Sequence, residues 1–303
     1  MADLKLSLFG KEFKNPVIAA SGIYGYGEEY EKFFPLSALG GFVSKATTLN
    51  KRTGNDGVRI TEVAAGVMFS VGLQNGGADN YIKEKLPRLL ESGTNVFTNV
   101  AGSDESEYLA VVEKLNETAA PLIELNISCP NVSLGGSSIS ASARATESVV
   151  SKVRKLTSKP FTAKLSPNVT DIAEIAKAAE AGGANGIALI NSLPAMKIDI
   201  KTRRPLFRNN TAAISGEAVF PLAVKLVWQA ARAVKIPVIG VGGIATGEHA
   251  VEMMMAGASA VEVGAAALKD PYAPVRIIAE INEWLDFNGV GSVGEIIGSV
   301  KPW

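Results

Sequence analysis

Short apolar runs alternate along the chain with longer stretches in which apolar residues recur at helical spacing. The helical stretches include Asp171–Ala181, with Ile172 and Ile175 on its apolar face, and Ala218–Val234. Strands that are apolar on both faces and separated by helices are typical of a parallel sheet buried on both sides. Eight runs predict such strands: Pro16–Gly22, Gly41–Thr48, Asn95–Gly102, Pro121–Pro130, Pro160–Pro167, Gly186–Ser192, Pro237–Gly243 and Ala260–Ala266.

Eight strand–helix units predict an α/β fold, a (β/α)8 TIM barrel, which needs about 250 residues. A single domain over residues 1–303 therefore accounts for the chain and leaves about 50 residues for insertions. These fall in Leu49–Ser70, Asn131–Ala143 and Lys197–Ser215, each after the carboxyl end of a predicted strand. Because barrel enzymes build their active sites at that end, the inserted loops point to the functional face.

Two further segments have a distinctive composition. Met1–Lys14 mixes charged residues with alternating apolar ones, which predicts a small strand pair and not a signal peptide. The Gly/Ser-rich stretch Ser133–Ser142 is typical of a slack surface turn, but its position beside the densest polar motif favours a lid.

Polar side chains stand at the ends of the first six predicted strands. A polar side chain inside an apolar strand costs about 1–3 kcal/mol unless it is paired, so each one alone could be a barrel residue bonded to its neighbour. Together, at one rim of the barrel, they predict a site. These residues are Ser21, Lys45, Asn99, Asn126, Lys164 and Asn191.

The last two predicted strands end in glycine. Gly242-Gly243 and Gly264 each lead into a helix start, where free backbone N–H groups can surround a phosphate. Glycine turns after the seventh and eighth strands are the usual phosphate site of this barrel. They predict a phosphorylated ligand.

Charge and cysteine content narrow the possible functions. The 30 Lys+Arg balance 30 Asp+Glu, so the chain has no electrostatic footprint for nucleic acid or an anionic membrane. No apolar stretch approaches the roughly 18 residues of a spanning helix. A single Cys cannot form an internal disulfide, which favours a reducing, cytoplasmic location. One Cys and one His also cannot form an iron–sulfur cluster or a Cys/His zinc site, so no bound metal is expected. Redox chemistry would need an organic cofactor, and the phosphate turns favour FMN.

Two lysines and one thiol are the candidate reactive groups. Lys45 and Lys164 point to one centre, and each buried ammonium would need an anion, which a reduced flavin, a phosphate or a substrate carboxylate could supply. A Schiff-base lysine is the alternative. Cys129 follows the fourth strand, where a thiol can reach a ligand, although a lone Cys is more often an inert buried residue. His249 is expected to face solvent, which argues against a Cys/His hydrolase.

These residues resemble the class 1 dihydroorotate dehydrogenases, and within them the B type. The similarity covers nearly the whole chain, and ELNISCPN together with the two lysines is its most specific part. The matching segments are NPVIAASG (15–22), SKATT (44–48), VGLQN (71–75), NVAG (99–102), ELNISCPN (124–131), AKLSPN (163–168), Asn191-Ser192, DIKTRRP (199–205), ISG (214–216) and IGVGGI (239–244).

The resemblance implies an FMN-dependent enzyme that oxidises dihydroorotate to orotate in pyrimidine biosynthesis. Cys129 would take a proton from substrate C5 while a hydride leaves C6 for the flavin. The implied FMN-binding residues are Ser21, Lys45, Ala46, Asn99, Asn126, Lys164, Ile190, Gly216, Gly242, Gly243, Gly264 and Ala265. The implied substrate-binding residues are Lys45, Phe69, Val71, Gly72, Leu73, Asn126, Asn131, Asn191 and Ser192. The implied partner is an FAD and iron–sulfur subunit that passes electrons to NAD, in a homodimer or heterotetramer.

The chain departs from the family pattern around the substrate. Phe69 stands where the family usually has an Asn that helps to hold the substrate, and Gly76 replaces a usual Pro. Ser133-Leu134, Ala212-Ala213 and Ala265 replace a more basic pair, a Gly pair and a Thr. Two alternatives therefore stand beside dihydroorotate oxidation: an FMN oxidoreductase for another dihydropyrimidine or cyclic ureide, and a flavin-free lyase or aldolase that uses Lys45 or Lys164.

Overall fold

The computed structural model describes residues 2–128, 139 and 141–303, and its centre is a closed barrel of eight parallel strands. The strands follow one another around the barrel in chain order, and each hydrogen-bonds to its sequence neighbours. The predicted TIM barrel is therefore confirmed, with strands shorter than the apolar runs. They are β3 (Val17–Ala19), β4 (Gly41–Val43), β7 (Asn95–Val100), β8 (Leu122–Asn126), β9 (Phe161–Lys164), β10 (Gly186–Leu189), β15 (Val238–Val241) and β16 (Ala260–Val263).

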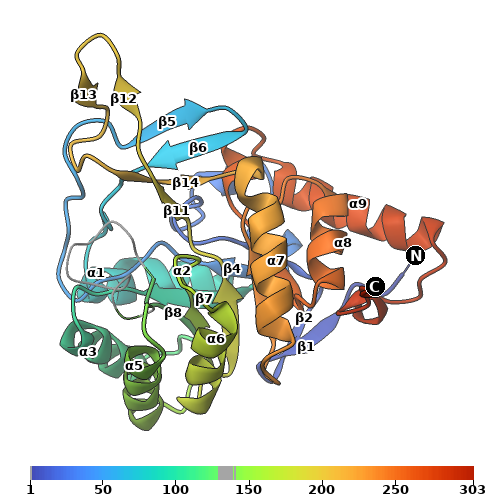
Figure 1. The fold of residues 1–303 in the computed structure, drawn as a ribbon. Coiled ribbons are helices and arrows are strands. Elements are labelled where there is room, and N and C mark those ends of the chain that lie inside the picture. The colour runs from blue at the N-terminus through green and yellow to red at the C-terminus, as the bar shows by residue number, and fades with distance from the viewer. Residues whose placement is uncertain (1, 129–138, 140) are drawn as a thin grey trace.

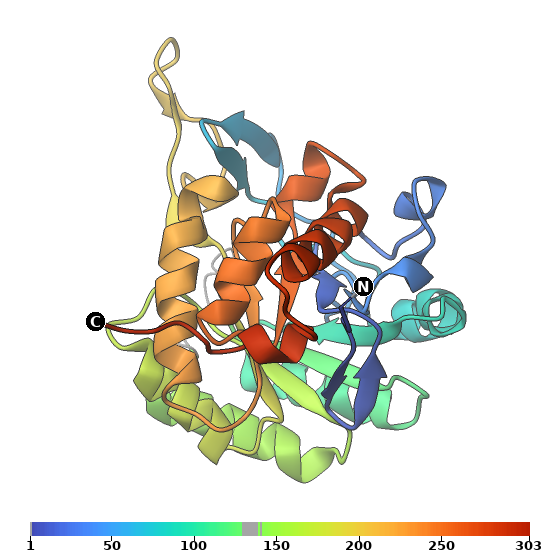
Figure 2. The same ribbon diagram turned by 90° about the vertical axis from the view of Figure 1, so that its right-hand side faces the viewer.

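Helices cover the outside of the barrel (Figures 1 and 2). The α-helices are α1 (Ala78–Asn80), α2 (Leu86–Glu91), α3 (Glu105–Asn116), α5 (Ala143–Leu156), α6 (Ile172–Ala181), α7 (Phe220–Ala231), α8 (Gly247–Met255) and α9 (Ala273–Phe287). Short 3-10 turns occur at η1 (Tyr30–Lys32), η2 (Leu36–Ala38), η4 (Glu217–Val219), η5 (Ala265–Leu268) and η6 (Val293–Ile296), and η3 (Tyr81–Lys85) is a π-helix. Within the described ranges no helix has the length and apolar character needed to cross a bilayer.

The two helices predicted from periodicity are present. Asp171 accepts a hydrogen bond from the Ala173 N–H and caps α6, whose predicted apolar face is buried. The second predicted helix begins as the 3-10 turn η4 and continues as α7, because Pro221 lies in its first α-helical turn.

A hairpin closes the amino end of the barrel. Strands β1 (Leu6–Leu8) and β2 (Lys11–Phe13) pair as expected from the N-terminal pattern. The rings of Phe9, Phe13 and Phe97 pack on one another with centroids 6.0–6.4 Å apart. We call these three residues the barrel floor, which seals one end of the barrel with apolar surface.

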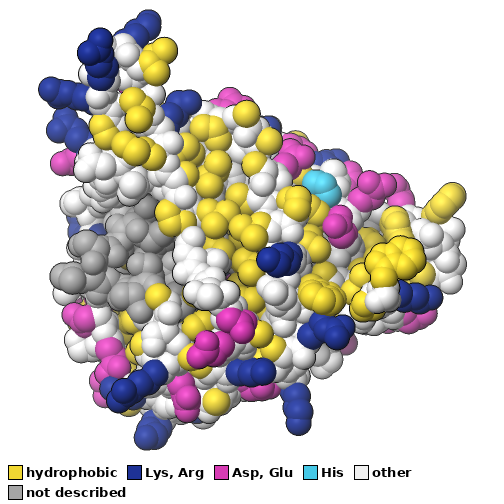
Figure 3. All heavy atoms as spheres, in the orientation of Figure 1, with side chains coloured by type: hydrophobic (Ala, Val, Ile, Leu, Met, Phe, Trp, Pro, Cys, Tyr) yellow, Lys and Arg dark blue, Asp and Glu magenta, His cyan; other side chains and the backbone are white. Residues whose placement is uncertain are grey.

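Two of the three insertions form one structure at the other end of the barrel, in place of separate loops. Strands β5 (Ile60–Val63) and β6 (Gly66–Phe69) join β14 (Ala212–Ser215) and β11 (Leu193–Ala195) in an antiparallel sheet. In both views this sheet lies at the end away from the β1–β2 hairpin. Beyond it, β12 (Ile198–Asp199) and β13 (Arg204–Pro205) form a projecting hairpin on which basic side chains gather (Figure 3). The predicted lid lies almost entirely outside the described residues.

Candidate active site

Three adjoining cavities lie between the carboxyl ends of the barrel strands and the inserted sheet. Their volumes are about 320, 80 and 230 Å³. Gly243 and Ala265 line both the first and the second, while Ser21, Phe69 and Lys164 line both the second and the third. The three spaces therefore form one continuous candidate site.

The structure brings the predicted site residues together around these cavities. Among the described ones, every residue predicted to bind cofactor or substrate lines at least one cavity, except Asn99. The lining set is Ser21, Lys45, Ala46, Phe69, Val71, Gly72, Leu73, Asn126, Lys164, Ile190, Asn191, Ser192, Gly216, Gly242, Gly243, Gly264 and Ala265. Cys129 and Asn131 lie outside the described residues.

The glycine turn after β15 has the geometry of an anion cradle. Gly242 and Gly243 have positive φ values of 124° and 75°, which favour glycine. A Cβ on Gly243 would lie 2.7 Å from Phe220 Cβ and 2.8 Å from the Gly216 carbonyl oxygen. The N–H groups of both glycines donate no hydrogen bond within the described chain. Free N–H groups beside a close backbone approach suit a phosphate.

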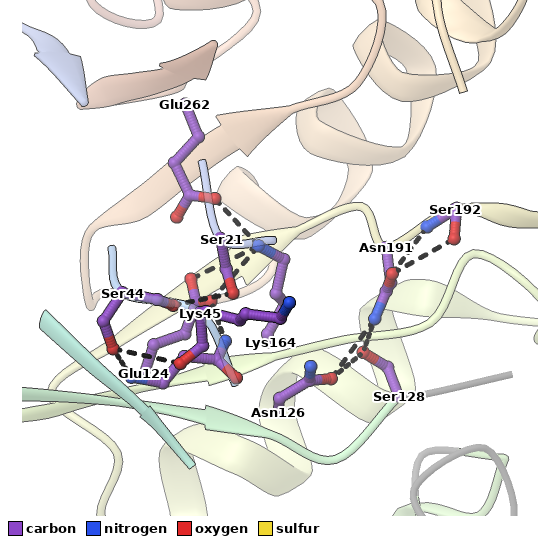
Figure 4. Close-up of polar contacts among 11 residues, drawn as sticks. Ser21, Ser44, Lys45, Glu124, Asn126, Ser128, Lys164, Asn191, Ser192 and Glu262 are labelled. Atoms are coloured by element: carbon purple, nitrogen blue, oxygen red, sulfur yellow. Dashed lines mark hydrogen bonds and ion pairs between the residues drawn. The ribbon is translucent and has the colours of Figure 1, made fainter. Parts of the chain in front are cut away.

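Amide and hydroxyl side chains form one wall of the site. Asn191 donates from Nδ2 to Asn126 Oδ1 at 3.2 Å and to Ser128 Oγ at 2.8 Å. Asn191 Oδ1 in turn accepts from the Ser192 N–H at 2.8 Å. These bonds fix the orientation of the amides, as Figure 4 shows. The wall can therefore present donors and acceptors at fixed positions to a polar ligand.

Lys45 follows β4, and hydrogen bonds with Ser21 and Gly25 hold the backbone at this point. Ser21 Oγ donates to the Ser44 carbonyl at 2.9 Å, and the Lys45 N–H donates to the Gly25 carbonyl at 2.9 Å. Burial lowers the pKa of the half-buried Lys45 ammonium. An anion in the cavity would stabilise this charge, as the sequence predicted.

Lys164 is paired with two carboxyl groups of the protein itself. This corrects the expectation from the sequence that a ligand would supply its anion. Its ammonium lies 3.2 Å from Glu124 Oε1 and 2.8 Å from Glu262 Oε2, and both glutamate side chains are buried (Figure 4). Burial alone would lower the pKa of Lys164, but the two carboxyl groups outweigh it and raise that pKa. We call Glu124, Lys164 and Glu262 the buried triad.

Asn99 belongs to the layer of the triad and not to the cavity wall. Its Nδ2 donates to Glu124 Oε1 at 2.5 Å, and its side chain is fully buried. Among the described contacts Asn99 supports Glu124, and its predicted contact with a flavin stays a prediction.

Comparison with known proteins decides the family. The family model described as "Dihydroorotate dehydrogenase" matches residues 3–285. The chain belongs to the dihydroorotate dehydrogenase family. Curated relatives named "Dihydroorotate dehydrogenase B (NAD(+)), catalytic subunit" include those of Petrotoga mobilis and Bacteroides thetaiotaomicron, each 46% identical over 99% of this chain and 100% of the relative. The relative of that name from Geobacter sulfurreducens is 46% identical over 99% of this chain and 98% of its own length. The resemblance to this family is confirmed.

In this member of the dihydroorotate dehydrogenase family, Phe69 lies in the wall of the candidate site. It ends β6, pairs with Ala213 of β14, and its half-buried side chain lines two of the cavities together with Asn191 and Ser192. The residue that departs from the family pattern therefore lies in the same cavity wall as the amides.

His249 is not a free surface side chain, which corrects the expectation from the sequence. It is half-buried, stacks on the Phe220 ring with centroids 4.2 Å apart, and accepts the Ala245 N–H at Nδ1. Its position supports the turn after Gly243, and it lines none of the three cavities.

Glu124 and Glu262 were not predicted as site residues from the sequence. Both lie inside apolar strands, two positions before Asn126 and Gly264, and therefore on the same side of the strand as those residues. A charged residue in such a strand was a usable signal, because an unpaired buried carboxylate is too costly to occur by chance.

Proposed function

We propose that this chain is the FMN-binding catalytic subunit of a dihydroorotate dehydrogenase and oxidises dihydroorotate to orotate. The residues that match the family's motifs gather around three adjoining cavities, in a chain that matches the family over nearly its whole length, and this gathering supports the proposal. The relatives' names supply the reaction, and the lysines and oriented amides supply a suitable site.

The residues at the cavities fit FMN. The Gly242-Gly243 turn, together with Gly264 and Ala265, would hold its phosphate through backbone N–H groups. Ser21, Ala46, Ile190 and Gly216 would surround the rest of the cofactor, with Lys45 and Lys164 supplying positive charge. When bound, FMN supplies an acceptor for the hydride that leaves substrate C6.

The chain's own residues would bind the substrate and move its proton. The backbone around Val71, Gly72 and Leu73 would hold the polar edge of the ring opposite the Asn126–Asn191–Ser192 wall and Lys45. Asn131 would complete the substrate shell. Cys129 would take the proton from C5, and loss of this proton and of the C6 hydride leaves the double bond of orotate.

The name of the relatives also suggests a partner. A catalytic subunit of a B-type, NAD-linked enzyme passes its electrons to a second subunit, for which the family resemblance implies FAD and an iron–sulfur cluster. We infer that this chain reduces such a subunit, in a homodimer or heterotetramer within the cytoplasm. Co-expression with an FAD and iron–sulfur subunit of this family and analytical ultracentrifugation would test this assembly.

The first test is the cofactor. The purified protein should be yellow and release FMN stoichiometrically on denaturation, measured by chromatography of the released flavin. Anaerobic addition of dihydroorotate should then bleach the flavin absorbance in a single turnover. Bound FAD, or a colourless protein that binds no flavin, would contradict the proposal and favour a lyase.

The second test is the base. Cys129→Ala should bind FMN normally and slow flavin reduction by about 10²–10⁴-fold, because a positioned acid–base group contributes this much. The wild-type rate should rise with pH through the ionisation of the thiol, whose unperturbed pKa is about 8.5. Full activity of the Ala variant, or a rate independent of pH, would remove Cys129 from the mechanism.

A second candidate function rests on Phe69. An apolar ring in the cavity wall cannot replace the amide that the family usually has there, which favours another dihydropyrimidine or cyclic ureide as substrate. A panel of dihydropyrimidines in the bleaching assay compares the two candidates directly. Lys164 does not suit the role of nucleophile in the alternative lyase. A nucleophilic lysine must lose its proton, and two carboxyl groups stabilise the charged ammonium of Lys164.

A further inference from the structure

The buried triad crosses the inside of the barrel. Glu124 lies on β8 and Glu262 on β16, and these strands stand four places apart in the closed ring of eight, so they face each other. Lys164 of β9 reaches between them (Figure 4). Glu124 is 0% exposed, Glu262 1% and Lys164 5%. Of the three, only Lys164 lines the cavities, so the two glutamates lie beneath the site.

The charges of the triad do not balance if all three groups are ionised. One ammonium then faces two carboxylates in a space that excludes water, and a buried charge without a counter-ion is strongly unfavourable. Lys164 and Glu124 are the charged groups that act on Glu262, and its register partners on the neighbouring strands β3 and β15 are the apolar residues Ile18 and Val241. None of these can supply the missing positive charge.

The two carboxyl groups are also unequally supported. Glu124 accepts from Asn99 Nδ2 as well as from Lys164. Glu262 accepts only from Lys164 through Oε2, and its buried Oε1 has no hydrogen-bond partner in the described part of the chain. A bare carboxylate oxygen in such surroundings takes up a proton more readily than a supported one.

We propose that Glu124 and Glu262 hold one proton between them, so that the triad is a buried proton-binding site of zero net charge beneath the cavity. The proton resides mainly on Glu262, the less supported carboxyl. Burial, and next the nearby Glu124 carboxylate, raise the pKa of Glu262 well above its ordinary value.

This proton would affect the flavin, a consequence that rests on the proposed function. Lys164 forms part of the cavity wall, so its positive charge acts on whatever the cavity holds. With the proton in place, Glu124 alone balances Lys164. Loss of the proton would put a net negative charge beneath the flavin and disfavour its reduction. Glu262 is thus a positioning residue that acts through Lys164.

The proton site itself is tested by the pH dependence of folding. An unfolded Glu has a pKa of about 4.3, so the contribution of the Glu262 proton to stability should be complete below that pH and be lost as pH rises through the raised folded-state pKa of Glu262. Glu262→Gln cannot lose this proton. The folding equilibrium constant of wild type relative to Glu262→Gln should therefore fall by up to tenfold per pH unit over an interval above pH 5.

Urea unfolding of the FMN-loaded proteins between about pH 5 and 9 measures this ratio, with FMN affinity determined at each pH and its contribution subtracted. Glu174→Gln, an exposed change on α6, is the matched control. Glu124→Gln should flatten the pH dependence as well, because it leaves one carboxylate for one ammonium. The proton site would be overturned if the ratio of the wild-type to the Glu262→Gln folding constant were as independent of pH as the ratio of wild type to the Glu174→Gln control. Failure of both triad variants to fold would overturn it as well.

The effect on the flavin is tested by the midpoint potential of bound FMN. Wild type and Glu262→Gln should agree at low pH, and the wild-type potential should fall below that of the variant as the proton leaves. Equal potentials at all pH values, with the pH-dependent folding difference intact, would overturn the action on the flavin alone. Absence of bound FMN would instead contradict the proposed function, and the same folding comparison, made on the proteins as purified, would still test the proton site.

Discussion

The barrel floor and the buried triad occupy the same interior but differ in chemistry. Three strands show the change from one inward residue to the next. Going towards the carboxyl end, Phe97 is followed by Asn99 on β7, Leu122 by Glu124 on β8, and Ala260 by Glu262 on β16. Successive inward side chains are two residues apart, so one step along each strand changes an apolar layer into a polar one. One end of these strands therefore stabilises the barrel, and the other end prepares the site.

The largest expected effect comes from removing the cation of the triad. Lys164→Met would leave Glu124 without its counter-ion, and breaking a buried ion pair from one side costs about 3–5 kcal/mol of unfolding free energy. The loss should be larger at pH 8 than at pH 5, because protonation relieves the unpaired carboxylate. Urea unfolding at the two pH values measures it, and a loss that does not depend on pH would contradict the ionic character of the triad.

The barrel floor should respond almost as strongly but without this pH dependence. Phe97→Ala removes a ring that contacts Phe9 and Phe13, and such truncations cost about 3–5 kcal/mol. FMN affinity of the folded protein should stay close to wild type. Phe287→Ala is the control, since that side chain is 91% exposed and its removal should change stability by no more than about 0.5 kcal/mol. A large loss of FMN affinity in the folded Phe97 variant would show that the two layers are not separate.

At the cavity end of the barrel, a change of Phe69 should affect function and not stability. If a polar edge of orotate lacks a partner there, Phe69→Asn should tighten orotate binding by about 1–3 kcal/mol, or roughly one to two powers of ten. It should also raise dihydroorotate turnover. Titration of flavin absorbance with orotate measures both proteins. Micromolar binding to wild type that Asn does not improve would exclude the altered-substrate candidate.

The smallest effect is expected outside the barrel. Lys152 of α5 donates to Glu105 of α3 at 2.6 Å, but both side chains are substantially exposed. Because exposed ion pairs contribute little, Lys152→Ala should lower stability by only about 0.2–1 kcal/mol, and less at high salt. Thermal unfolding at two salt concentrations checks this, and a loss comparable to that of Lys164→Met would remove the distinction between buried and exposed ion pairs.

The pattern of apolar and polar residues along the chain is enough to predict the barrel and most of the site lining. Eight apolar runs separated by helical spacing have few other ways to bury both faces of each strand, and chain order then fixes the order of strands around the barrel. The polar residues Ser21, Lys45, Asn126, Lys164 and Asn191 were found for the same reason, since the carboxyl ends of parallel strands meet at one rim.

Which groups pair across the barrel is seen only in the folded protein. Lys164 meets Glu262, 98 positions away, and β6 meets β14 across a separation of more than 140 residues, and no local periodicity encodes such contacts. The sequence could show that Lys164 needs an anion but not that the protein supplies two. Charge balance in a buried space depends on which side chains close around it, and this is fixed by how the ring of strands closes.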